Sequence, residues 1–178
     1  MRKLFFCIVA FVLFVSVNTY AADPVYQWNL VLVSKAKISH VGTDYSITDG
    51  TCTLYDDNTF DLYEDDYGTD RHYTGSYQII NGKTIIFSLD QQGLNEIETM
   101  LTDWVEGVAE EEGVQISNIS FVIKQLKISK AKINKKTNMP KKMTVTIKGT
   151  VSAFVDGSYE TSNFQHKGKL TFFSNALF

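Results

Sequence analysis

The strongest constraint on the fold is a two-residue alternation of apolar and polar side chains, which recurs in short runs along most of the chain. Cys52 and Leu54 fall on one face of such a run, and Phe60 and Leu62 do so in the next. Residues 56–58, Asp-Asp-Asn, lie between the two runs and favour a turn, because Asp and Asn side chains bond nearby backbone groups. The alternation predicts antiparallel strands with one face buried and one face in water.

More strands are expected on both sides of this hairpin. The segment 26–33 predicts a first strand that continues through Ile38, and Asn81-Gly82 predicts a tight hairpin because both residues tolerate positive φ. Alternating or β-rich runs return at 120–133, 143–153 and 164–173. This spacing is typical of a barrel or sandwich, and closure leaves no exposed edge strand. We therefore expect a mainly β fold, an antiparallel β-barrel of about eight strands.

One segment in the middle of the chain has a helical period instead. The apolar residues at this spacing are Leu94, Ile97, Leu101, Trp104, Val105 and Val108. We expect one amphipathic helix at about 94–112. Its apolar face should plug or flank the barrel, because soluble monomers rarely leave so large an apolar patch in water.

The start of the chain has the layout of a secretory signal. Arg2 and Lys3 precede an apolar run over 4–15, and residues 18–22 are then small or polar. The run is shorter than the ~20 residues that a membrane-spanning helix needs, which argues against an uncleaved anchor. We expect cleavage after Ala21, so that 1–21 is a signal peptide and 22–178 is a single exported domain. Its location would be periplasmic or extracellular.

Charge is distributed unevenly along the chain. Residues 44–112 hold 17 acidic and 2 basic side chains, whereas residues 113–178 hold 2 acidic and 11 basic ones. Because no Pro, Gly or Ser-rich linker separates the two segments, we expect one domain with oppositely charged faces. The lysines between 124 and 148 are not interleaved with aromatic residues, so nucleic acid is not an expected partner.

Few residues suit common catalytic or metal chemistry. His40, His72 and His166 are the only histidines, and we expect them at the surface because none has a metal-binding spacing. Cys52, the only cysteine after the signal, should be a buried thiol. The carboxylates at 56–70 leave a glycosidase pair or a weak calcium loop open, but their turn-forming neighbours favour solvated turns. We expect no enzyme, no catalytic residue, no metal and no cofactor.

The chain resembles the lipocalin-like group of small secreted barrels over roughly residues 26–89. Trp28 is similar to the tryptophan on the first strand of that group. The run 74–77, Thr-Gly-Ser-Tyr, followed by Asn-Gly-Lys at 81–83 and an apolar strand, is also similar. The resemblance implies a lipocalin-like β-barrel that binds a small apolar ligand and catalyses no reaction.

A ligand cavity inside such a barrel would be lined by inward-facing strand residues. The ligand-binding candidates are Trp28, Leu54, Phe60, Leu62, Tyr77 and Phe87. The same positions suit a packed core, which is the more frequent interior of a barrel this small. An alternative function is a protein-binding module of the cell envelope, such as an assembly factor or a protease inhibitor.

Overall fold

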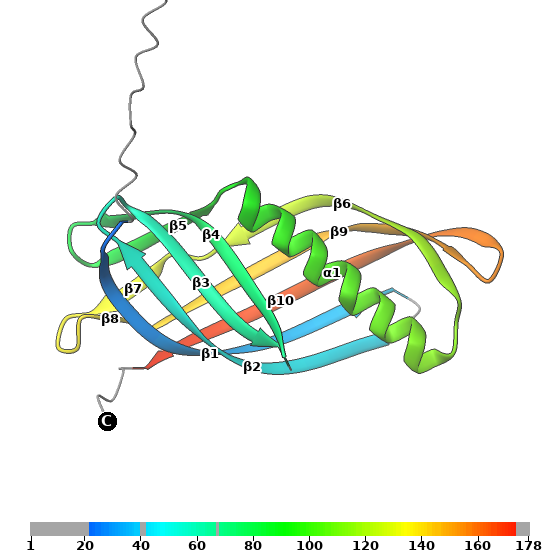
Figure 1. Cartoon of the computed structure of the whole chain (residues 1–178), viewed down its shortest axis with the longest axis horizontal. Helices are drawn as coiled ribbons and strands as arrows, with labels where there is room; N and C mark the ends of the chain where they lie inside the picture. The colour runs from blue at the N-terminus through cyan, green and yellow to red at the C-terminus, as the bar shows by residue number, and fades with distance from the viewer. Residues whose placement is uncertain (1–21, 40–41, 67, 174–178) are drawn as a thin grey trace, which may run out of the picture.

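The computed structural model describes residues 22–39, 42–66 and 68–173, which form a curled antiparallel sheet and one helix (Figure 1). The sheet order is β6-β9-β10-β1-β2-β3-β4-β5-β7-β8. The elements are β1 Pro24–Ile38, β2 Gly42–Tyr55, β3 Thr59–Asp66, β4 Thr69–Ile80, β5 Thr84–Leu89, α1 Gln91–Glu112, β6 Ile116–Ile128, β7 Ala131–Asn134, β8 Met139–Pro140, β9 Lys142–Val155 and β10 Ser158–Phe173. The expected mainly β class with one mid-chain helix is confirmed.

The described residues form ten strands rather than the expected number of about eight. The β-rich run 120–133 is not one strand, because β6 and β7 within it pair with different neighbours, β9 and β5. The segment between the expected runs 120–133 and 143–153 contains the two-residue strand β8, in which Pro140 lies opposite Ile133. These short strands carry too few alternating residues to be recognised from sequence.

The sheet curls into a half-barrel whose two edges are joined by one stretch of chain. Only residues 129–130 separate β6 from β7, yet β6 pairs with β9 at one edge of the sheet and β7 pairs with β5 at the other. The curl therefore closes at the end that holds β7 and β8. At the other end a seam remains between β4 and β6.

Helix α1 lies along this seam and contacts β4, β5 and β6 (Figure 1). Asp90 caps its N-terminus by accepting a hydrogen bond from the backbone N–H of Gly93 at 2.8 Å, and the Thr74 hydroxyl of β4 donates to the same carboxylate oxygen. Gly93 allows the close approach, because a Cβ there would collide with the carbonyl oxygen of Thr74. The start of the helix is thus fixed against β4.

The buried face of α1 differs from the expected one by a small rotation. Ile97, Leu101 and Val105 are buried as expected. Leu94, Trp104 and Val108 are only half-buried, and the core positions are completed by Gly93 and Ala109. The helix also begins at Gln91, three residues before the expected start. The small residues Gly93 and Ala109, at the two ends of the buried stripe, allow the helix to lie close to the neighbouring strands. A search for large apolar residues at helical spacing does not find such small residues.

The tight hairpin expected at Asn81-Gly82 connects β4 to β5. The two residues have φ angles of 52° and 61°, and the backbone N–H of Lys83 donates to the carbonyl oxygen of Ile80 at 3.0 Å. Positive φ at both central positions matches the right-handed twist of the flanking strands. This turn sets the register in which Tyr77 lies opposite Phe87.

Two hydrophobic clusters fill the curl. One, at the closed end, contains Trp28, Leu54 and Cys52. Cys52 is free and fully buried, and burial raises the pKa of its thiol to about 12. The other cluster lies beneath the helix and joins Leu101 to Ile147 and Phe164 of β9 and β10. The expected buried thiol is confirmed.

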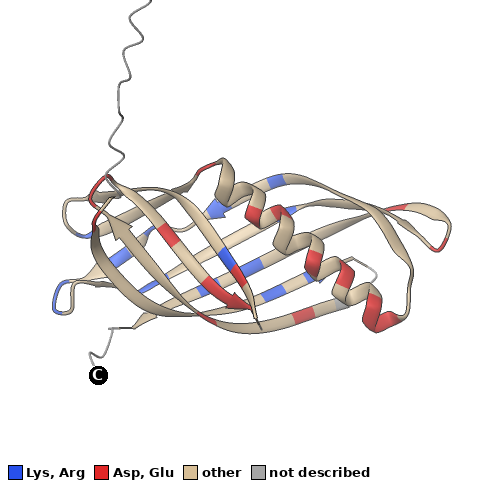
Figure 2. Ribbon diagram, viewed as in Figure 1, with Lys and Arg blue, Asp and Glu red and all other residues tan. Residues whose placement is uncertain are grey.

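The acidic and basic segments of the chain both contribute strands to this sheet. Acidic side chains lie along β3, β4 and α1, whereas most of the lysines lie on the strands after α1 and their loops (Figure 2). The lysines between 124 and 148 are all exposed. The uneven charge along the sequence therefore gives two unlike surfaces.

The expected signal peptide, residues 1–21, lies outside the described residues. Within the part of the chain that the structure describes, no helix is both long and apolar enough to cross a membrane.

The packing of α1 predicts unequal effects for two leucine substitutions. Leu101 is fully buried, so Leu101→Ala should lower the free energy of unfolding by about 2–5 kcal/mol. Leu94 is half-buried, and Leu94→Ala should cost only ~1 kcal/mol. Urea unfolding of the two variants and the parent measures both values. Equal losses, or a larger loss at Leu94, would show that the helix packs through a different face.

Candidate functional site

A cavity of about 760 Å³ lies between α1 and strands β1 to β4. We call it the polar cavity. This volume is within the range of small-molecule sites in proteins. Its wall combines apolar side chains, such as Leu32 and Met100, with buried polar ones, among them Glu64, Arg71 and His166.

The polar cavity exists because β2 is longer than its neighbour β3. The two strands pair only over residues 49–54 of β2, and β3 ends at Asp66. Residues 42–48 of β2 pair with β1, and no described strand pairs with their other side. Asp44 and Tyr45 of this free edge line the polar cavity together with α1. The wall is therefore incomplete between β2 and the helix.

A buried carboxyl group, Glu64 of β3, lies on the sheet side of the polar cavity. Its Oε1 accepts a hydrogen bond from the Thr48 hydroxyl at 2.5 Å, and its Oε2 accepts one from the Tyr73 hydroxyl at 2.9 Å. Burial raises the pKa of Glu64, although both hydrogen bonds act against that shift. The pKa of Tyr73 is raised by burial and by the neighbouring Glu64. Tyr73 therefore remains a neutral donor at physiological pH.

Arg71 of β4 joins the sheet to the helix. Its side chain is 4% exposed, and its Nη2 lies 2.8 Å from Asp103 Oδ2 of α1. Nε lies 3.4 Å from Asp66 Oδ2 of β3, and Nη1 lies 3.5 Å from Glu96 Oε1 of α1. Glu96 balances the charge on Nη1 but does not hydrogen-bond to it. Removing one partner of such a buried pair typically costs about 3–5 kcal/mol.

Three buried nitrogen atoms at the polar cavity have no hydrogen-bond partner among the described residues. They are Arg71 Nη1, Trp104 Nε1 and His166 Nδ1, and all three residues line the same cavity. An unpaired buried polar group costs about 1–3 kcal/mol, so such groups are rare away from functional sites. Because the three residues line one cavity, we take this cavity as the candidate site.

His166 of β10 is buried rather than exposed, contrary to the expectation from sequence. Burial lowers the pKa of its imidazole from 6.5 to about 4, so the ring is neutral at pH 7. A neutral ring can accept a hydrogen bond at one nitrogen and donate one from the other. His72 is exposed as expected and bonds Asp61 at 2.9 Å, while His40 lies outside the described residues.

A second stripe of α1, next to the core stripe, faces the polar cavity. It contains Met100, Trp104, Gly107, Val108 and Glu111. Met100, Trp104 and Val108 each directly precede a buried residue of the core stripe, namely Leu101, Val105 and Ala109. Trp104 and Val108 are only half-buried because they face the polar cavity and not the core. A Cβ placed on Gly107 would meet no atom within 4 Å. Gly107 thus leaves space on the cavity side of the helix.

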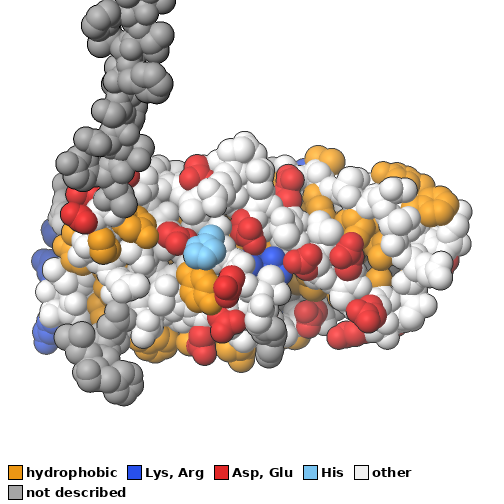
Figure 3. Space-filling model, in the orientation of Figure 1, with side chains coloured by type: hydrophobic (Ala, Val, Ile, Leu, Met, Phe, Trp, Pro, Cys, Tyr) orange, Lys and Arg blue, Asp and Glu red, His pale blue; other side chains and the backbone are white. Residues whose placement is uncertain are grey.

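The opening of the polar cavity is acidic. The lining side chains Asp44, Asp66, Asp103 and Glu111 are partly or fully exposed. In the space-filling view, acidic side chains gather over α1 and the neighbouring strands (Figure 3). The one arginine among them is Arg71, whose charge is already balanced by its own carboxylates. A molecule that approaches this opening therefore meets a negative potential.

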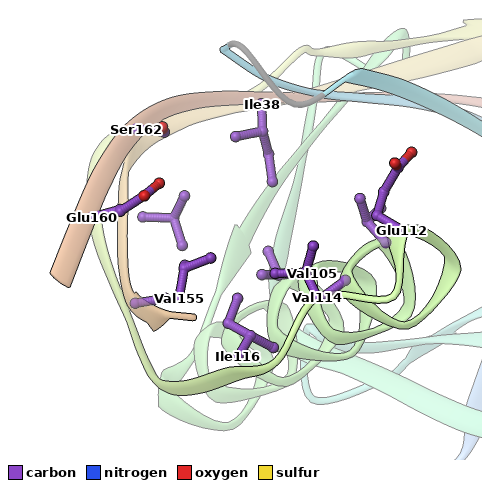
Figure 4. A pocket seen from close by; sticks show the side chains of 12 residues that line it. Ile38, Val105, Glu112, Val114, Ile116, Val155, Glu160 and Ser162 are labelled. Carbon is purple, nitrogen blue, oxygen red and sulfur yellow. The ribbon is translucent and has the colours of Figure 1, made fainter. Parts of the chain in front are cut away.

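A more apolar cavity of about 300 Å³ lies at the C-terminal end of α1, between the helix and β9 and β10. Ile38, Val105, Ile116 and Val155 are among its lining residues (Figure 4). Val108 lines both this cavity and the polar one, and a hollow of about 110 Å³ shares residues with each. The three spaces therefore adjoin one another beneath the second half of the helix.

The six residues predicted to bind a ligand lie together, but none lines the polar cavity. Trp28, Leu54, Phe60, Leu62 and Phe87 are buried in the cluster at the closed end, and Tyr77 packs against it. Phe60, Leu62 and Phe87 line an apolar space of only about 70 Å³, whereas Tyr77 donates a hydrogen bond to the Tyr55 carbonyl oxygen. Their role in binding stays a prediction.

The candidate site residues that sequence reasoning missed were present in the strand alternation. Glu64 follows Phe60 and Leu62 at two-residue steps, so it points to the same inner face as they do. Arg71 precedes Tyr73 in the same way, and His166 lies between Phe164 and Gly168. A charged or titratable residue at an inward position is the signal that could have found them.

The acidic turns considered for calcium remain at the surface. Asp56 and Asp57 are exposed, and Asp57 accepts hydrogen bonds from the backbone and hydroxyl of Thr59. Within the described ranges, no three histidine, cysteine or acidic side chains converge as metal ligands would.

The buried His166 predicts a specific loss of stability in acid. Between pH 6.5 and 4 the unfolded chain takes up a proton at this residue, whereas the folded chain does not. The free energy of unfolding should therefore fall by up to about 3 kcal/mol over this range as pH decreases. Denaturant unfolding of the parent and His166→Gln between pH 7 and pH 4 isolates this contribution.

The difference in stability between parent and His166→Gln should shrink or reverse as pH falls. Glu64 has a raised pKa, so its protonation favours the folded protein as pH falls. Because Glu64 is present in both proteins, this effect cancels in the difference between them. Parallel pH profiles for the two proteins would contradict the buried neutral histidine.

No family model matches this chain, and a search of curated proteins gives no match either.

Proposed function

We propose that this protein is an exported, non-enzymatic, lipocalin-like binding protein that holds one small molecule in the polar cavity. The observation that carries the proposal is the convergence of Arg71, Trp104 and His166, each with an unpaired buried nitrogen, on one cavity of about 760 Å³. A bound polar group that pairs with these atoms would recover part of the cost of burying them.

The character of the wall indicates an amphipathic ligand rather than a purely apolar one. The polar cavity shares Leu32, Met100 and His166 with the small apolar space that Phe60 and Phe87 line. An apolar part of the ligand can contact this inner surface while its polar part meets the buried nitrogens. Binding sites of this kind combine mostly apolar walls with a few placed polar groups.

The groups that would bind the ligand are held in place before it arrives. The Arg71 guanidinium is fixed by carboxylates from β3 and α1, and Glu64 is fixed by hydrogen bonds to Thr48 and Tyr73. Preorganised groups lose little conformational entropy on binding, which favours affinity. The contacts between Arg71 and α1 also keep the helix at the distance from the sheet that the cavity requires.

A protein-binding module of the cell envelope is the second candidate. The free edge of β2 at residues 42–48 could accept an extended peptide as an additional strand. Tyr45 and Ile47 on this edge are 65% and 64% exposed, which is high for large apolar side chains. This candidate predicts that Ile47→Asp prevents binding of a partner protein to this edge.

Gly107→Leu tests the small-molecule function without removing any core contact. The new side chain should occupy the polar cavity, because a Cβ at this position meets only open space. The helix should be stabilised by up to about 1 kcal/mol, since glycine is unfavourable within helices. We expect the parent to bind N-phenyl-1-naphthylamine at one equivalent, with increased probe fluorescence, and the variant to lose this binding at an unchanged or higher Tm.

The matched control is Glu106→Leu, which adds the same side chain to the exposed side of α1 and lines none of the cavities described above. It should bind the probe as the parent does. Unchanged binding in Gly107→Leu, or no binding in the parent, would contradict the proposal.

A further inference from the structure

The carboxylates that line the polar cavity exceed its positive charges. Five acidic residues line it, against the single Arg71. Asp66 and Asp103 are within ion-pair distance of Arg71, and Glu64 is hydrogen-bonded to Thr48 and Tyr73. Asp44 and Glu111 make no ion pair with any described residue.

Asp44 and Glu111 come from opposite walls of the opening. Asp44 belongs to the free edge of β2, whereas Glu111 belongs to the last turn of α1. Both line the polar cavity and also the adjoining hollow of about 110 Å³, together with Trp104 and Val108. Two uncompensated carboxylates thus flank the passage between these spaces, beside a tryptophan.

An indole ring beside carboxylates is suited to a positive group. The face of a tryptophan ring attracts cations, and this attraction is larger where water is partly excluded. Lys35 and Lys37 of β1 adjoin the lining residue Ala36, but both are exposed on the other face of the strand. The Lys35 Nζ lies over the Tyr45 ring at 4.8 Å from its centre. An anion would be repelled at the opening, because the surrounding potential is negative.

The interior provides an independent indication of a ligand. The Arg71 side chain is 4% exposed and His166 is 7% exposed, and each of these lining residues has a buried nitrogen without a hydrogen-bond partner among the described residues. Neutral His166 can accept a hydrogen bond from a donor on the ligand, and Trp104 Nε1 can donate one to an oxygen. The inner wall therefore suits an uncharged polar group near the apolar surface of Leu32 and Met100.

We propose that the ligand is a small organic cation, an ammonium attached to an apolar body, with its charge between Asp44 and Glu111 beside Trp104. This inference rests on the proposed binding function and specifies its ligand class. The apolar body lies against the inner wall of the polar cavity, and the carboxylates at the opening attract and orient the cation. The acidic surface of α1 and β3 then raises the local concentration of such molecules near the opening.

Three probes of equal chain length separate the effect of charge from that of the chain. Octyltrimethylammonium, 1-octanol and octanoate are each titrated into the Trp28→Phe protein, in which Trp104 is the only tryptophan after residue 22. We expect octyltrimethylammonium to bind roughly tenfold more tightly than 1-octanol, with octanoate weakest, and its affinity to fall as NaCl is added.

The carboxylates are tested by the double variant Asp44→Asn and Glu111→Gln. It should weaken octyltrimethylammonium binding by about tenfold or more and leave 1-octanol binding unchanged, because only the charge is removed. The control Glu110→Gln removes a neighbouring exposed carboxylate that lines no cavity described above, and it should change neither affinity by more than about twofold.

The possible failures are distinguishable. If 1-octanol or octanoate binds as tightly as octyltrimethylammonium, or the double variant binds the cation like the parent, the cation assignment is wrong and the binding function stands. If none of the three probes and no N-phenyl-1-naphthylamine binds, the proposed function fails as well.

Discussion

The structure depends on how α1 occupies the seam that the curled sheet leaves between β4 and β6. The stretch from β6 to β7 joins the two edges only at one end. Elsewhere the helix forms the wall, fixed at its N-terminus by Asp90 and Thr74 and along its length by Arg71. Without the helix, the cluster around Ile147 and Phe164 would face water. The position of α1 therefore determines both stability and the shape of the cavity.

The same helix presents two adjacent stripes with different roles. Leu101 and Val105 are packed into the core, whereas Trp104 and Gly107 border open space. A helix that must stabilise the fold and also line a cavity cannot bury its whole apolar face. The half-buried Trp104 and the absence of a side chain at Gly107 follow from this division. The buried polar groups opposite the helix reduce stability, and their retention is physically reasonable if they contact a ligand.

Much of the architecture was predictable because it is encoded locally. The alternation around Cys52 and Phe60, the positive φ angles at Asn81-Gly82 and the helical period around Leu101 each indicate an element without tertiary information. The split between β6 and β7 was not predictable, since strand partners are set by the curl of the whole sheet. The free edge of β2 also depends on where β3 ends, which the sequence of β2 does not contain.

The candidate site was predicted less well, for a physical reason. Apolar inward residues such as Trp28 and Phe87 were expected to line a ligand cavity, yet they fill the closed end of the curl. Space remains between α1 and the free edge of β2, where the inward residues of the sheet include Glu64, Arg71 and His166. Strand alternation shows which way a side chain points, but the distance between opposite walls depends on the curvature of the sheet.

The most direct measurement of the central claim is the indole N–H resonance of Trp104 in ¹H–¹⁵N NMR spectra during titration with N-phenyl-1-naphthylamine. Trp28 provides an internal reference, because it is buried in the cluster at the closed end of the curl. If the polar cavity is the binding site, the Trp104 resonance shifts and saturates at one equivalent while the Trp28 resonance stays in place. A shift confined to Trp28, or no shift at either residue, would contradict a binding site between α1 and the sheet.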